Sequence, residues 1–491
     1  MRKPFLSIST LLIDFLLITF LSAAQNDSEV RWQAPTDPAV KAKLDIWRDW
    51  KFGVIIHWGP YSVWGVTESW TICPEDEPWC QRRGPYADNY YEYVKQYEQL
   101  PAIFNPVNFN PTRWAKACKN AGMRYMVFTT RHHDGFCMYD SKYSDYKITA
   151  PFSAFSSHPQ SNITLHVFNA FRNEGLGIGA YYSKPDWHHP DYWWPYFPPT
   201  DRNVNYDPAK YPEKWNNFKS YVYNQIDELT KDYGPIDILW LDGGWVRPVG
   251  RLTAETQPWL GKNQWIQDIG MDSLALVARS HQPSLLIVDR TVHGPYENYL
   301  TPEQQIPNQP LPYPWESCIT LGDSWYTTGP GENFKSAQWI IHTLVKIVAR
   351  GGNLLLGIGP DKTGDFPQAV YERLEQTGQW MKRFGEAIYG TKPLAPYQED
   401  SWHFTCKPDG SQYAILLKKE GEAPDYHLFL PTAWADIKGV ISIPGIHKTF
   451  KLKGNKGKRY ISLNRREADD LKKLPALVLC RKINNNKTSK Q

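Results

Sequence analysis

A carboxylate, two glycines and an indole follow an apolar run of strand length near the middle of the chain. Residues 236–241 read Ile-Asp-Ile-Leu-Trp-Leu and lead directly into Asp242, Gly243, Gly244 and Trp245. In an α/β barrel, a buried strand that ends in an Asp presents that group to a ligand. Asp before Gly is also a common turn signal, so a turn cap explains this stretch equally well. Other residues of the chain decide between these interpretations.

Polar and aromatic side chains also follow the other strands that the apolar pattern predicts. The carboxyl ends of parallel barrel strands meet on one face, so these side chains are expected to converge. Five strand ends supplying such groups to one face favour a ligand site over isolated turn caps. The residues concerned are His57, His132, His133, Tyr182, Trp240, Asp242, Asp289 and Arg290.

The adjacent histidines invite comparison with metal sites. On an extended backbone, His132 and His133 would point in opposite directions, and His188 and His189 would do the same. The sequence holds no helical His-x-x-x-His motif with a Glu base. Neutral imidazoles that hydrogen-bond to ligand hydroxyls explain these residues at least as well. We therefore expect no metal ion and no cofactor.

Cleavage of a glycosidic bond requires two carboxyl groups, and Asp242 suits the role of nucleophile because a rigid strand holds it. The acid/base should come from a loop-borne carboxyl group. Three glutamates follow the strand that ends at Asp289: Glu297, Glu303 and Glu316. A long loop without secondary structure is usually functional. Spacing alone does not choose among the three.

Short apolar strands alternate with helical patterns over most of the chain, which predicts a parallel sheet closed into a (β/α)8-like barrel. The expected strands are Val54–Trp58, Tyr125–Thr130, Gly177–Ser183, one ending at Asp242, Leu285–Asp289 and Asn353–Ile358. The expected helices are Pro111–Ala121, Val167–Glu174, Pro212–Asp232, Ile269–Ser280, Phe334–Ala349 and Pro367–Tyr389. Short alternating strands separated by turn residues follow from about Leu394 and predict an antiparallel β-sandwich.

The predicted organisation is a signal peptide at residues 1–24, a catalytic barrel at 30–392, a β-sandwich at 393–481 and a disordered polar tail at 482–491. A basic start, an apolar stretch and the small residues Ser22-Ala23-Ala24 are typical of a cleaved signal peptide. We therefore expect export to the periplasm or the extracellular space. No later segment is apolar for long enough to span a bilayer.

The net charge and the amino-acid composition limit the classes of molecule that the protein is expected to bind. The net charge of +4 is too weak to indicate binding to nucleic acid or to anionic membranes. Aromatic residues form 14% of the chain, with 22 Trp, which favours an aromatic-lined cleft such as sugar-binding enzymes use. Among seven cysteines, Cys73 and Cys80 could close a small local disulfide, and Cys406 and Cys480 are a second candidate pair.

Three motifs in the same order resemble the α-L-fucosidases of glycoside hydrolase family 29. They are Phe52 to Ser62 (FGVIIHWGPYS), Thr129 to Phe136 (TTRHHDGF) and Trp240 to Trp245 (WLDGGW). The resemblance runs from about Trp47 to Tyr389. It implies a (β/α)8-like barrel followed by a β-sandwich and a retaining exo-enzyme that releases terminal α-linked L-fucose from an oligosaccharide or glycoconjugate.

The resemblance also implies roles for single residues. Asp242 corresponds to the nucleophile of the family, and Thr301-Pro302-Glu303 is similar to the segment that carries its acid/base, so Glu303 is the choice among the three glutamates. The substrate-binding positions map onto His57, His132, His133, Tyr182, Trp240, Arg290, Trp315 and Glu316. Two regions depart from the family pattern: Gly357 stands where Asn is usual, and Glu68 to Tyr97 matches loosely, which leaves Glu68, Trp70 and Asn89 unassigned.

Two other functions fit the same residues. An α-L-galactosidase of the same family would act on a sugar that differs from L-fucose by a C6 hydroxyl. A secreted fucose-binding protein without catalysis would keep the pocket but not use Asp242 and Glu303 for chemistry.

Overall fold

The computed structural model describes residues 32–248, 265–419, 422, 426–455 and 457–482. The predicted signal peptide at 1–24 lies outside the described residues, as does the predicted tail apart from Lys482. Within the described part of the chain, no helix is both long and apolar enough to cross a membrane.

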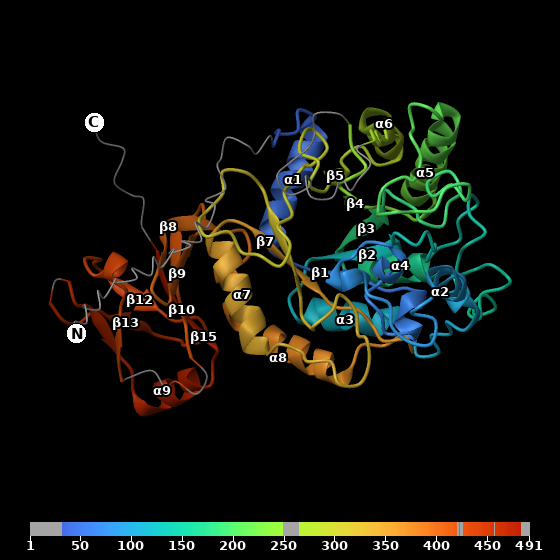
Figure 1. The fold of residues 1–491 in the computed structure, drawn as a ribbon. Helices are drawn as coiled ribbons and strands as arrows, with labels where there is room; N and C mark the ends of the chain where they lie inside the picture. The colour runs from blue at the N-terminus through green and yellow to red at the C-terminus, as the bar shows by residue number, and fades with distance from the viewer. Residues whose placement is uncertain (1–31, 249–264, 420–421, 423–425, 456, 483–491) are drawn as a thin grey trace, which may run out of the picture. The chain divides into compact units, whose positions relative to one another are not determined.

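Seven parallel strands form the main sheet, in the order β5-β4-β3-β2-β1-β7-β6 (Figure 1). The strands are β1 Phe52–Ile56, β2 Tyr125–Arg131, β3 Gly177–Ser183, β4 Ile238–Asp242, β5 Leu286–Asp289, β6 Glu316–Thr320 and β7 Asn353–Gly357. The sheet curls into the predicted barrel-like domain, with seven rather than eight strands among the described residues.

The segment from Glu297 to Glu303 lies between the two outer strands of this sheet. Glu297 forms an antiparallel bridge with Val288 of β5, and Glu303 forms a parallel bridge with Cys318 of β6. The amide of Gln304 donates to the carbonyl of Cys318 at 2.9 Å. These contacts attach the segment to the sheet, whereas the sequence predicts it as a free loop.

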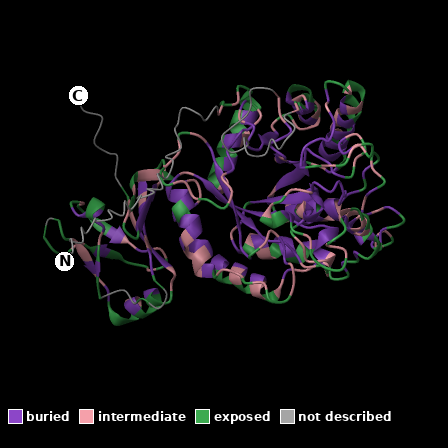
Figure 2. Cartoon of the chain, in the orientation of Figure 1, coloured by how far each residue is buried: buried purple, intermediate pink, exposed green. Residues whose placement is uncertain are grey.

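Alternation along the strands decides which side chains face the interior of the curled sheet. Successive side chains on a strand point to opposite faces, so Ile238, Trp240 and Asp242 of β4 share one side. Ile238 and Trp240 pack there with Tyr181 of β3, in a buried cluster that also includes Trp47 of the first helix. The catalytic candidate Asp242 therefore stands on top of this interior cluster. Figure 2 shows the central strands buried along their lengths.

Helices follow most of the strands. Asn110 caps α3 by accepting from the amide of Arg113, and Pro111 occupies its first turn, where a missing N–H has no cost. Gly122 has φ +93° and ends the same helix. The helices of this domain are α1 Pro38–Trp50, α2 Tyr90–Tyr97, α3 Pro111–Asn120, α4 Ile163–Asn173, α5 Pro212–Asp232, α6 Met271–His281, α7 Ala337–Ala349 and α8 Gln368–Phe384.

Antiparallel strands form the C-terminal part of the chain. A six-stranded sheet has the order β13-β12-β15-β10-β9-β8, and β11 pairs with β14 in a second sheet. Phe404, Trp434 and Ile461 belong to the buried cluster of this region. The elements are β8 Lys392–Glu399, β9 Trp402–Cys406, β10 Ser411–Leu417, β11 His427–Phe429, β12 Val440–Ser442, β13 Thr449–Lys451, β14 Tyr460–Ser462, α9 Arg465–Lys472 and β15 Ala476–Lys482.

The candidate disulfide between Cys406 and Cys480 does not fit this sheet. Cys406 on β9 pairs with Gln412, and Cys480 on β15 pairs with Tyr413, so β10 lies between them. Two strand spacings of about 4.8 Å separate their backbones, whereas a disulfide needs Cα atoms within about 7 Å. That suggested pairing is therefore wrong.

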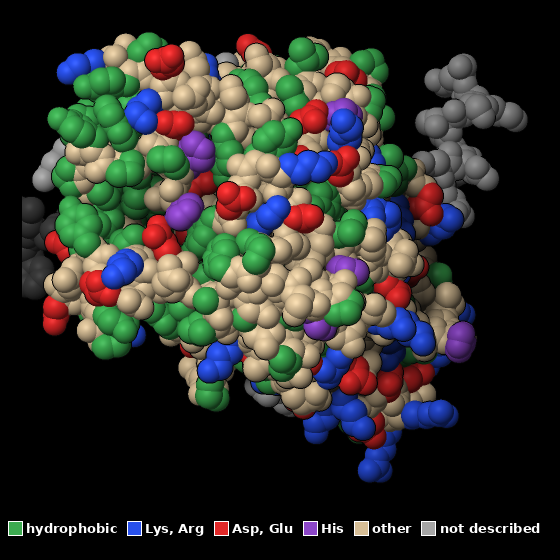
Figure 3. Space-filling view, turned by 90° about the vertical axis from the view of Figure 1, so that its right-hand side faces the viewer, with side chains coloured by type: hydrophobic (Ala, Val, Ile, Leu, Met, Phe, Trp, Pro, Cys, Tyr) green, Lys and Arg blue, Asp and Glu red, His purple; other side chains and the backbone are tan. Residues whose placement is uncertain are grey.

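Charged side chains of both signs are spread over the face that Figure 3 shows, with Lys and Arg most frequent toward its lower right. Lys and Arg side chains lie beside Asp and Glu side chains across this face. This pattern matches a net charge of only +4.

Candidate active site

A cavity of about 380 Å³ opens where the strands of the main sheet end. This volume is within the range of small-molecule sites. Five tryptophans give it extensive aromatic walls, and Asp242, Glu303, Arg202 and Arg290 bring charge to it. The lining residues are Ile55, His57, Thr67, Glu68, Trp70, Trp79, His132, Tyr181, Arg202, Trp240, Asp242, Trp245, Arg290, Glu303, Cys318 and Trp325.

Asp242 ends β4 and accepts hydrogen bonds on both carboxylate oxygens. The Tyr181 hydroxyl donates to Oδ2 at 2.7 Å, and the amide of Gly243 donates to Oδ1 at 2.8 Å. Gly243 has φ +90°, and a Cβ there would stand 2.3 Å from the ring of Pro185. A glycine is therefore required for the turn that aims this amide at the carboxylate.

Arg290 contacts both candidate catalytic carboxylates. Its Nη1 lies 3.2 Å from Asp242 Oδ1, and its Nη2 forms an ion pair with Glu303 Oε2. Asp242 is 15% exposed and Glu303 is 38% exposed, so Asp242 lies deeper. One planar guanidinium therefore joins the C-terminal end of β4 to the segment between β5 and β6.

The surroundings of Asp242 keep its carboxylate charged. Burial is the largest single influence and works to raise the pKa of Asp242, but the Arg290 guanidinium and the smaller lowering contributions, which include hydrogen bonds from the Tyr181 hydroxyl and the Gly243 amide, together outweigh it. The net effect holds the pKa of Asp242 well below its ordinary value. A carboxylate that stays ionised at neutral pH is what nucleophilic attack requires.

The three histidines at the site are uncharged at neutral pH. Burial lowers the pKa values of His57 and His132 well below their ordinary range, and burial lowers that of His133 to about 3. His57 and His132 line the cavity. Among the described residues, His57 Nδ1 has no hydrogen-bond partner. Neutral imidazoles of this kind can bind sugar hydroxyls without adding charge.

His132 and His133 lie side by side, which alternation on a strand would not allow. Their ring centroids are 4.3 Å apart. The expectation that they diverge is wrong because β2 ends at Arg131, so both follow the strand rather than belong to it. His132 Nδ1 contacts the Ser69 hydroxyl, and His133 Nδ1 contacts that of Ser183. His133 Nε2 lies 3.8 Å from Asp242 Oδ2.

Tyr181, rather than the predicted Tyr182, faces the cavity. Tyr181 pairs with Trp240 across the strands and contacts Asp242. Tyr182 points to the other side of β3, where its hydroxyl donates to Gln225 Oε1 at 2.8 Å. Counting alternate residues back from Ser183 would have placed Tyr181 on the inner face.

Glu316 and Trp315 lie outside the cavity lining. Glu316 begins β6, is 0% exposed, and accepts from the Tyr125 hydroxyl and from Trp240 Nε1, the latter at 3.3 Å. Burial raises the pKa of Glu316 to about 7. Trp315 is also buried and packs against Gly352, where a Cβ would stand 2.5 Å from the indole. Glu316 hydrogen-bonds to Trp240, which lines the cavity.

Glu297 also lies outside the lining. It is 2% exposed, and its carboxylate accepts from the amide of Thr291 at 2.9 Å and contacts His293 Nδ1 at 2.5 Å. These contacts hold the turn after β5, which carries Arg290. Of the three glutamates weighed from the sequence, only Glu303 lines the cavity.

The loop after β1 supplies residues that the sequence left unassigned. Glu68 lines the cavity, is 3% exposed and has φ +33°. Burial raises the pKa of Glu68 to about 8, and the charge of Glu303 contributes. Trp70 also lines the cavity. Both residues lie more than ten positions beyond the end of β1, in the segment that matches the family only loosely, so the sequence did not assign them.

Two further lining residues, Arg202 and Trp325, come from distant segments. Arg202 lies 4.9 Å from the ring centroid of Trp70 and forms an ion pair with Glu75. Trp325 stacks on His57 with ring centroids 5.3 Å apart. A Cβ at Gly357 would stand 2.9 Å from Trp325, so this glycine, found where the family usually has Asn, makes room for the indole.

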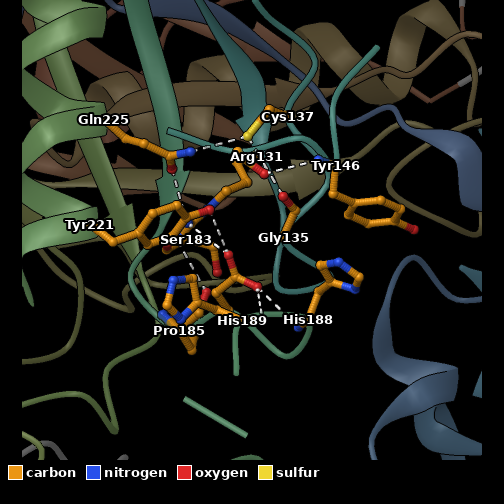
Figure 4. Close-up of polar contacts among 12 residues, drawn as sticks. Arg131, Gly135, Cys137, Tyr146, Ser183, Pro185, His188, His189, Tyr221 and Gln225 are labelled. Atoms are coloured by element: carbon orange, nitrogen blue, oxygen red, sulfur yellow. Dashed lines mark hydrogen bonds and ion pairs between the residues drawn. The ribbon is translucent and has the colours of Figure 1, made fainter. Parts of the chain in front are cut away.

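A buried network centred on Arg131 lies behind the cavity (Figure 4). Arg131 is 0% exposed, and its Nη1 lies 3.0 Å from Asp186 Oδ2 and 3.0 Å from Gln225 Oε1. Its Nη2 donates to the carbonyl of Ser183. Two backbone amides, of His188 and His189, donate to Asp186 Oδ1. The network thus fixes the segment after β3 against the end of β2.

The same network reaches the site through the backbone. The amide of Trp187, next to Asp186, donates to the carbonyl of His133 at 2.7 Å. The Trp187 and His133 rings lie 4.9 Å apart. Removing one partner of a buried charge pair costs about 3–5 kcal/mol, so the Arg131–Asp186 pair holds this segment in place.

A barrel-like domain with two carboxylates and neutral imidazoles in an aromatic-walled cavity at its strand ends defines a glycoside hydrolase. The chain belongs to the α-L-fucosidase family, glycoside hydrolase family 29, whose sequence profile matches residues 19–386. The plasma α-L-fucosidase of Rattus norvegicus is 30% identical over 390 residues, which cover 76% of this chain and 78% of that protein.

Two further comparisons agree. The tissue α-L-fucosidase of Homo sapiens is 30% identical over 430 residues, 82% of each chain. The solved structure of α-L-fucosidase isoenzyme 1 from Paenibacillus thiaminolyticus superposes with a TM-score of 0.70 at 27% identity, over 91% of this chain and 100% of that one. The predicted enzyme class and fold are therefore confirmed.

Proposed function

We propose that this protein is a retaining exo-α-L-fucosidase that releases terminal α-linked L-fucose from fucosylated oligosaccharides or glycoconjugates. Asp242 is the nucleophile and Glu303 is the acid/base. The observation that carries the proposal is the single Arg290 guanidinium in contact with both carboxylates beside one cavity.

The reaction takes two displacements. Asp242 attacks the anomeric carbon while the bond to the leaving oxygen breaks, and the Glu303 carboxyl group gives its proton to that oxygen. This leaves fucose covalently attached to Asp242. Glu303, now a carboxylate, then takes a proton from water as the water attacks the anomeric carbon and releases Asp242.

Proximity of the two carboxylates supports retention of configuration. Retaining enzymes hold their carboxyl groups about 5 to 5.5 Å apart, whereas inverting enzymes leave room for a water between them. Asp242 and Glu303 bind neighbouring nitrogens of one guanidinium, Nη1 and Nη2 of Arg290. This arrangement favours the shorter separation.

Exposure supports Glu303 over Glu68 as acid/base. The leaving oxygen carries the rest of the glycan, so its proton donor must stand near the opening of the cavity. The side chain of Glu303 is 38% exposed, whereas Glu68 as a whole residue is only 3% exposed. Glu68, whose raised pKa keeps it protonated at neutral pH, suits donation to a ring hydroxyl deeper in the cavity.

The walls suit a sugar with one apolar side. His57 and His132 line the cavity as neutral hydrogen-bonding groups, together with five tryptophans. An aromatic surface of this kind suits the apolar face of the ring and the C6 methyl group of L-fucose.

Product stereochemistry and a nucleophile variant test the first half of the proposal. NMR of the first product formed should show the α-anomer of L-fucose, and Asp242→Gly should lose activity by at least about 10³-fold. Formation of the β-anomer, or an active Asp242→Gly protein, would refute Asp242 as the nucleophile of a retaining enzyme.

Leaving-group dependence tests the acid/base. Glu303→Ala should lose most activity on substrates with poor leaving groups, keep more on activated aryl fucosides, and regain activity with azide. Glu68→Ala, Glu297→Ala and Glu316→Ala are the matched comparisons. If one of these shows that behaviour and Glu303→Ala does not, the assignment to Glu303 is wrong.

Rates on nitrophenyl α-L-fucoside and nitrophenyl α-L-galactoside test the sugar preference. We expect the fucoside to be cleaved faster because the aromatic walls gain nothing from a C6 hydroxyl. A faster galactoside reaction would favour the α-L-galactosidase alternative.

We also propose that the chain is exported and cleaved after Ala24, as its N-terminal residues predict. Mass spectrometry of protein from the culture medium or periplasm should give a mature chain that begins at Gln25. Retention of the intact N-terminus inside the cell would contradict this.

A further inference from the structure

We infer that Cys73 and Cys80 form a thiol–disulfide site that fixes one wall of the sugar cavity. Cys73 follows the 3-10 helix Trp70–Ile72, and Cys80 ends the 3-10 helix Pro78–Cys80. Their sulfur atoms lie within 4.8 Å of each other, and the two residues are 0% and 1% exposed. The described cysteines are all unbridged in this structure.

The segment between and around these cysteines carries much of the cavity wall. Thr67, Glu68 and Trp70 precede Cys73 and line the cavity, and Trp79 lines it from directly before Cys80. Ser69 on the same segment contacts His132 Nδ1. A covalent link across the base of this loop would therefore limit the movement of four lining residues.

Glu75 attaches the same loop to Arg202, which comes from a distant segment of the chain. Its Oε1 accepts from the amide of Arg202 at 2.9 Å and from Arg202 Nε at 2.7 Å, and its Oε2 pairs with Arg202 Nη2. Arg202 itself lines the cavity. The position of residues 73–80 therefore affects the lining residues of the loop after β1 and also the position of the Arg202 side chain.

A metal ion is the competing occupant because Glu75 stands beside the two sulfurs. The three ligand atoms lie within 4.8 Å of one another. However, both oxygens of Glu75 already accept from Arg202, which leaves two sulfurs where structural zinc takes four ligands. A disulfide needs only the two sulfurs.

The bridge would form by thiol–disulfide exchange with a small-molecule disulfide such as oxidised glutathione. One protein thiolate attacks this disulfide and displaces a glutathione thiolate, and the second protein thiolate then displaces the other. One S–S bond breaks and one forms, and two protons pass from the protein thiols to the two released thiols. Burial raises the pKa of Cys73, so exchange belongs to the stage before the loop packs.

Peptide mapping tests the bridge without any measurement of activity. Trypsin cleaves after Lys51 and Arg82, and the peptide Phe52–Arg82 contains Cys73 and Cys80 and no other cysteine. In full-length protein made in an oxidising compartment and kept free of reductant, this peptide should resist alkylation and gain two labels after reduction. Labelling of both thiols before reduction, with or without release of zinc, would overturn the inference.

The effect on the cavity rests on the proposed function and has its own test. C73S/C80S should lower kcat/KM on a nitrophenyl fucoside by about tenfold, because small displacements of binding groups are costly. Its activity should no longer respond to reductant. The control is C406S/C480S, two cysteines that the C-terminal sheet holds apart.

Wild-type protein provides a second measurement that needs no variant. Reduction should speed proteolytic cleavage within residues 73–80, because the freed loop opens more often. Unchanged kcat/KM together with unchanged proteolysis would overturn the role in fixing the wall. A protein without activity on any fucoside would refute the proposed function, while the peptide map would still decide the bridge.

Discussion

The Tyr181 hydroxyl donates a hydrogen bond to Asp242 Oδ2 at 2.7 Å from the neighbouring strand. Parallel pairing of β3 with β4 puts Tyr181 opposite Trp240, two residues before Asp242 on the same face. Tyr181 is itself 0% exposed. The strand register therefore determines one of the donors that keep the candidate nucleophile ionised.

Tyr181→Phe should lower kcat/KM by about 10- to 100-fold, because a hydrogen bond to a charged group contributes about 1.5–3 kcal/mol. Tyr182→Phe is the matched control, since its hydroxyl contacts Gln225 on the other side of the strand. We expect that control to lose about 1 kcal/mol of stability in urea unfolding and little activity. Equal losses of kcat/KM in the two variants would contradict the assignment of the inner face.

Arg290→Met should shift the acid limb of the pH profile of kcat/KM to higher pH. Burial alone would raise the pKa of Asp242, and the Arg290 charge is the main group that lowers it. Without Arg290, Asp242 should take up a proton at higher pH, so kcat/KM should begin to fall at higher pH than in the wild type. Arg113→Met, which removes a surface ion pair with Asp365, should leave the profile unchanged. An unshifted acid limb in Arg290→Met would contradict this electrostatic role.

Elements with a clear apolar period could be predicted from the sequence, and α5 has the bounds that the pattern gives, Pro212–Asp232. The sixth strand could not. Glu316–Thr320 reads Glu-Ser-Cys-Ile-Thr, without the apolar run of a buried strand, and its burial comes from its neighbours in the sheet. The strand Lys392–Glu399 contains two prolines, which argue against strand structure in a sequence.

The residues of the candidate site could also be predicted only in part from the sequence. Asp242, His57 and Arg290 stand at strand ends, so barrel topology brings them together. Arg202 and Trp325 reach the cavity from segments far along the chain, and no local pattern marks them. Tyr181 and Tyr182 differ only in the face of the strand they occupy, which depends on register rather than on residue type.

Gly135→Ala should destabilise the protein and disturb the network behind the cavity. Gly135 has φ +76°, and a Cβ there would stand 2.2 Å from Asp186 Oδ1, an oxygen held by two backbone amides. Gly84→Ala is the matched control, because Gly84 has φ +88° with nothing within 4 Å of its Cβ. The control should lose about 1–2 kcal/mol from backbone strain alone.

The difference between these two variants measures the contact with Asp186. We expect Gly135→Ala to lose more stability in urea unfolding and also to lower kcat/KM, since Trp187 next to Asp186 holds the His133 carbonyl. Similar stability and unchanged activity in both variants would show that the network tolerates displacement.

Glu316→Gln should make the protein less sensitive to alkaline pH. Burial raises the pKa of Glu316 from 4.5 to about 7, so the folded state holds this proton more tightly than the unfolded state does. The stability from that proton is fully present below pH 4.5 and is lost as the pH rises through about 7. A shift of this size corresponds to about 3 kcal/mol.

A glutamine keeps both contacts, since its carbonyl oxygen can accept from Trp240 Nε1 and its amide can donate to the Tyr125 hydroxyl. Urea unfolding should give Glu316→Gln and wild type similar stability near pH 4.5 and a more stable variant at pH 8. Glu372→Gln, half exposed on α8, should follow the wild type at both pH values. If the stability of Glu316→Gln falls with pH as steeply as that of the wild type, the buried carboxyl group does not carry this dependence.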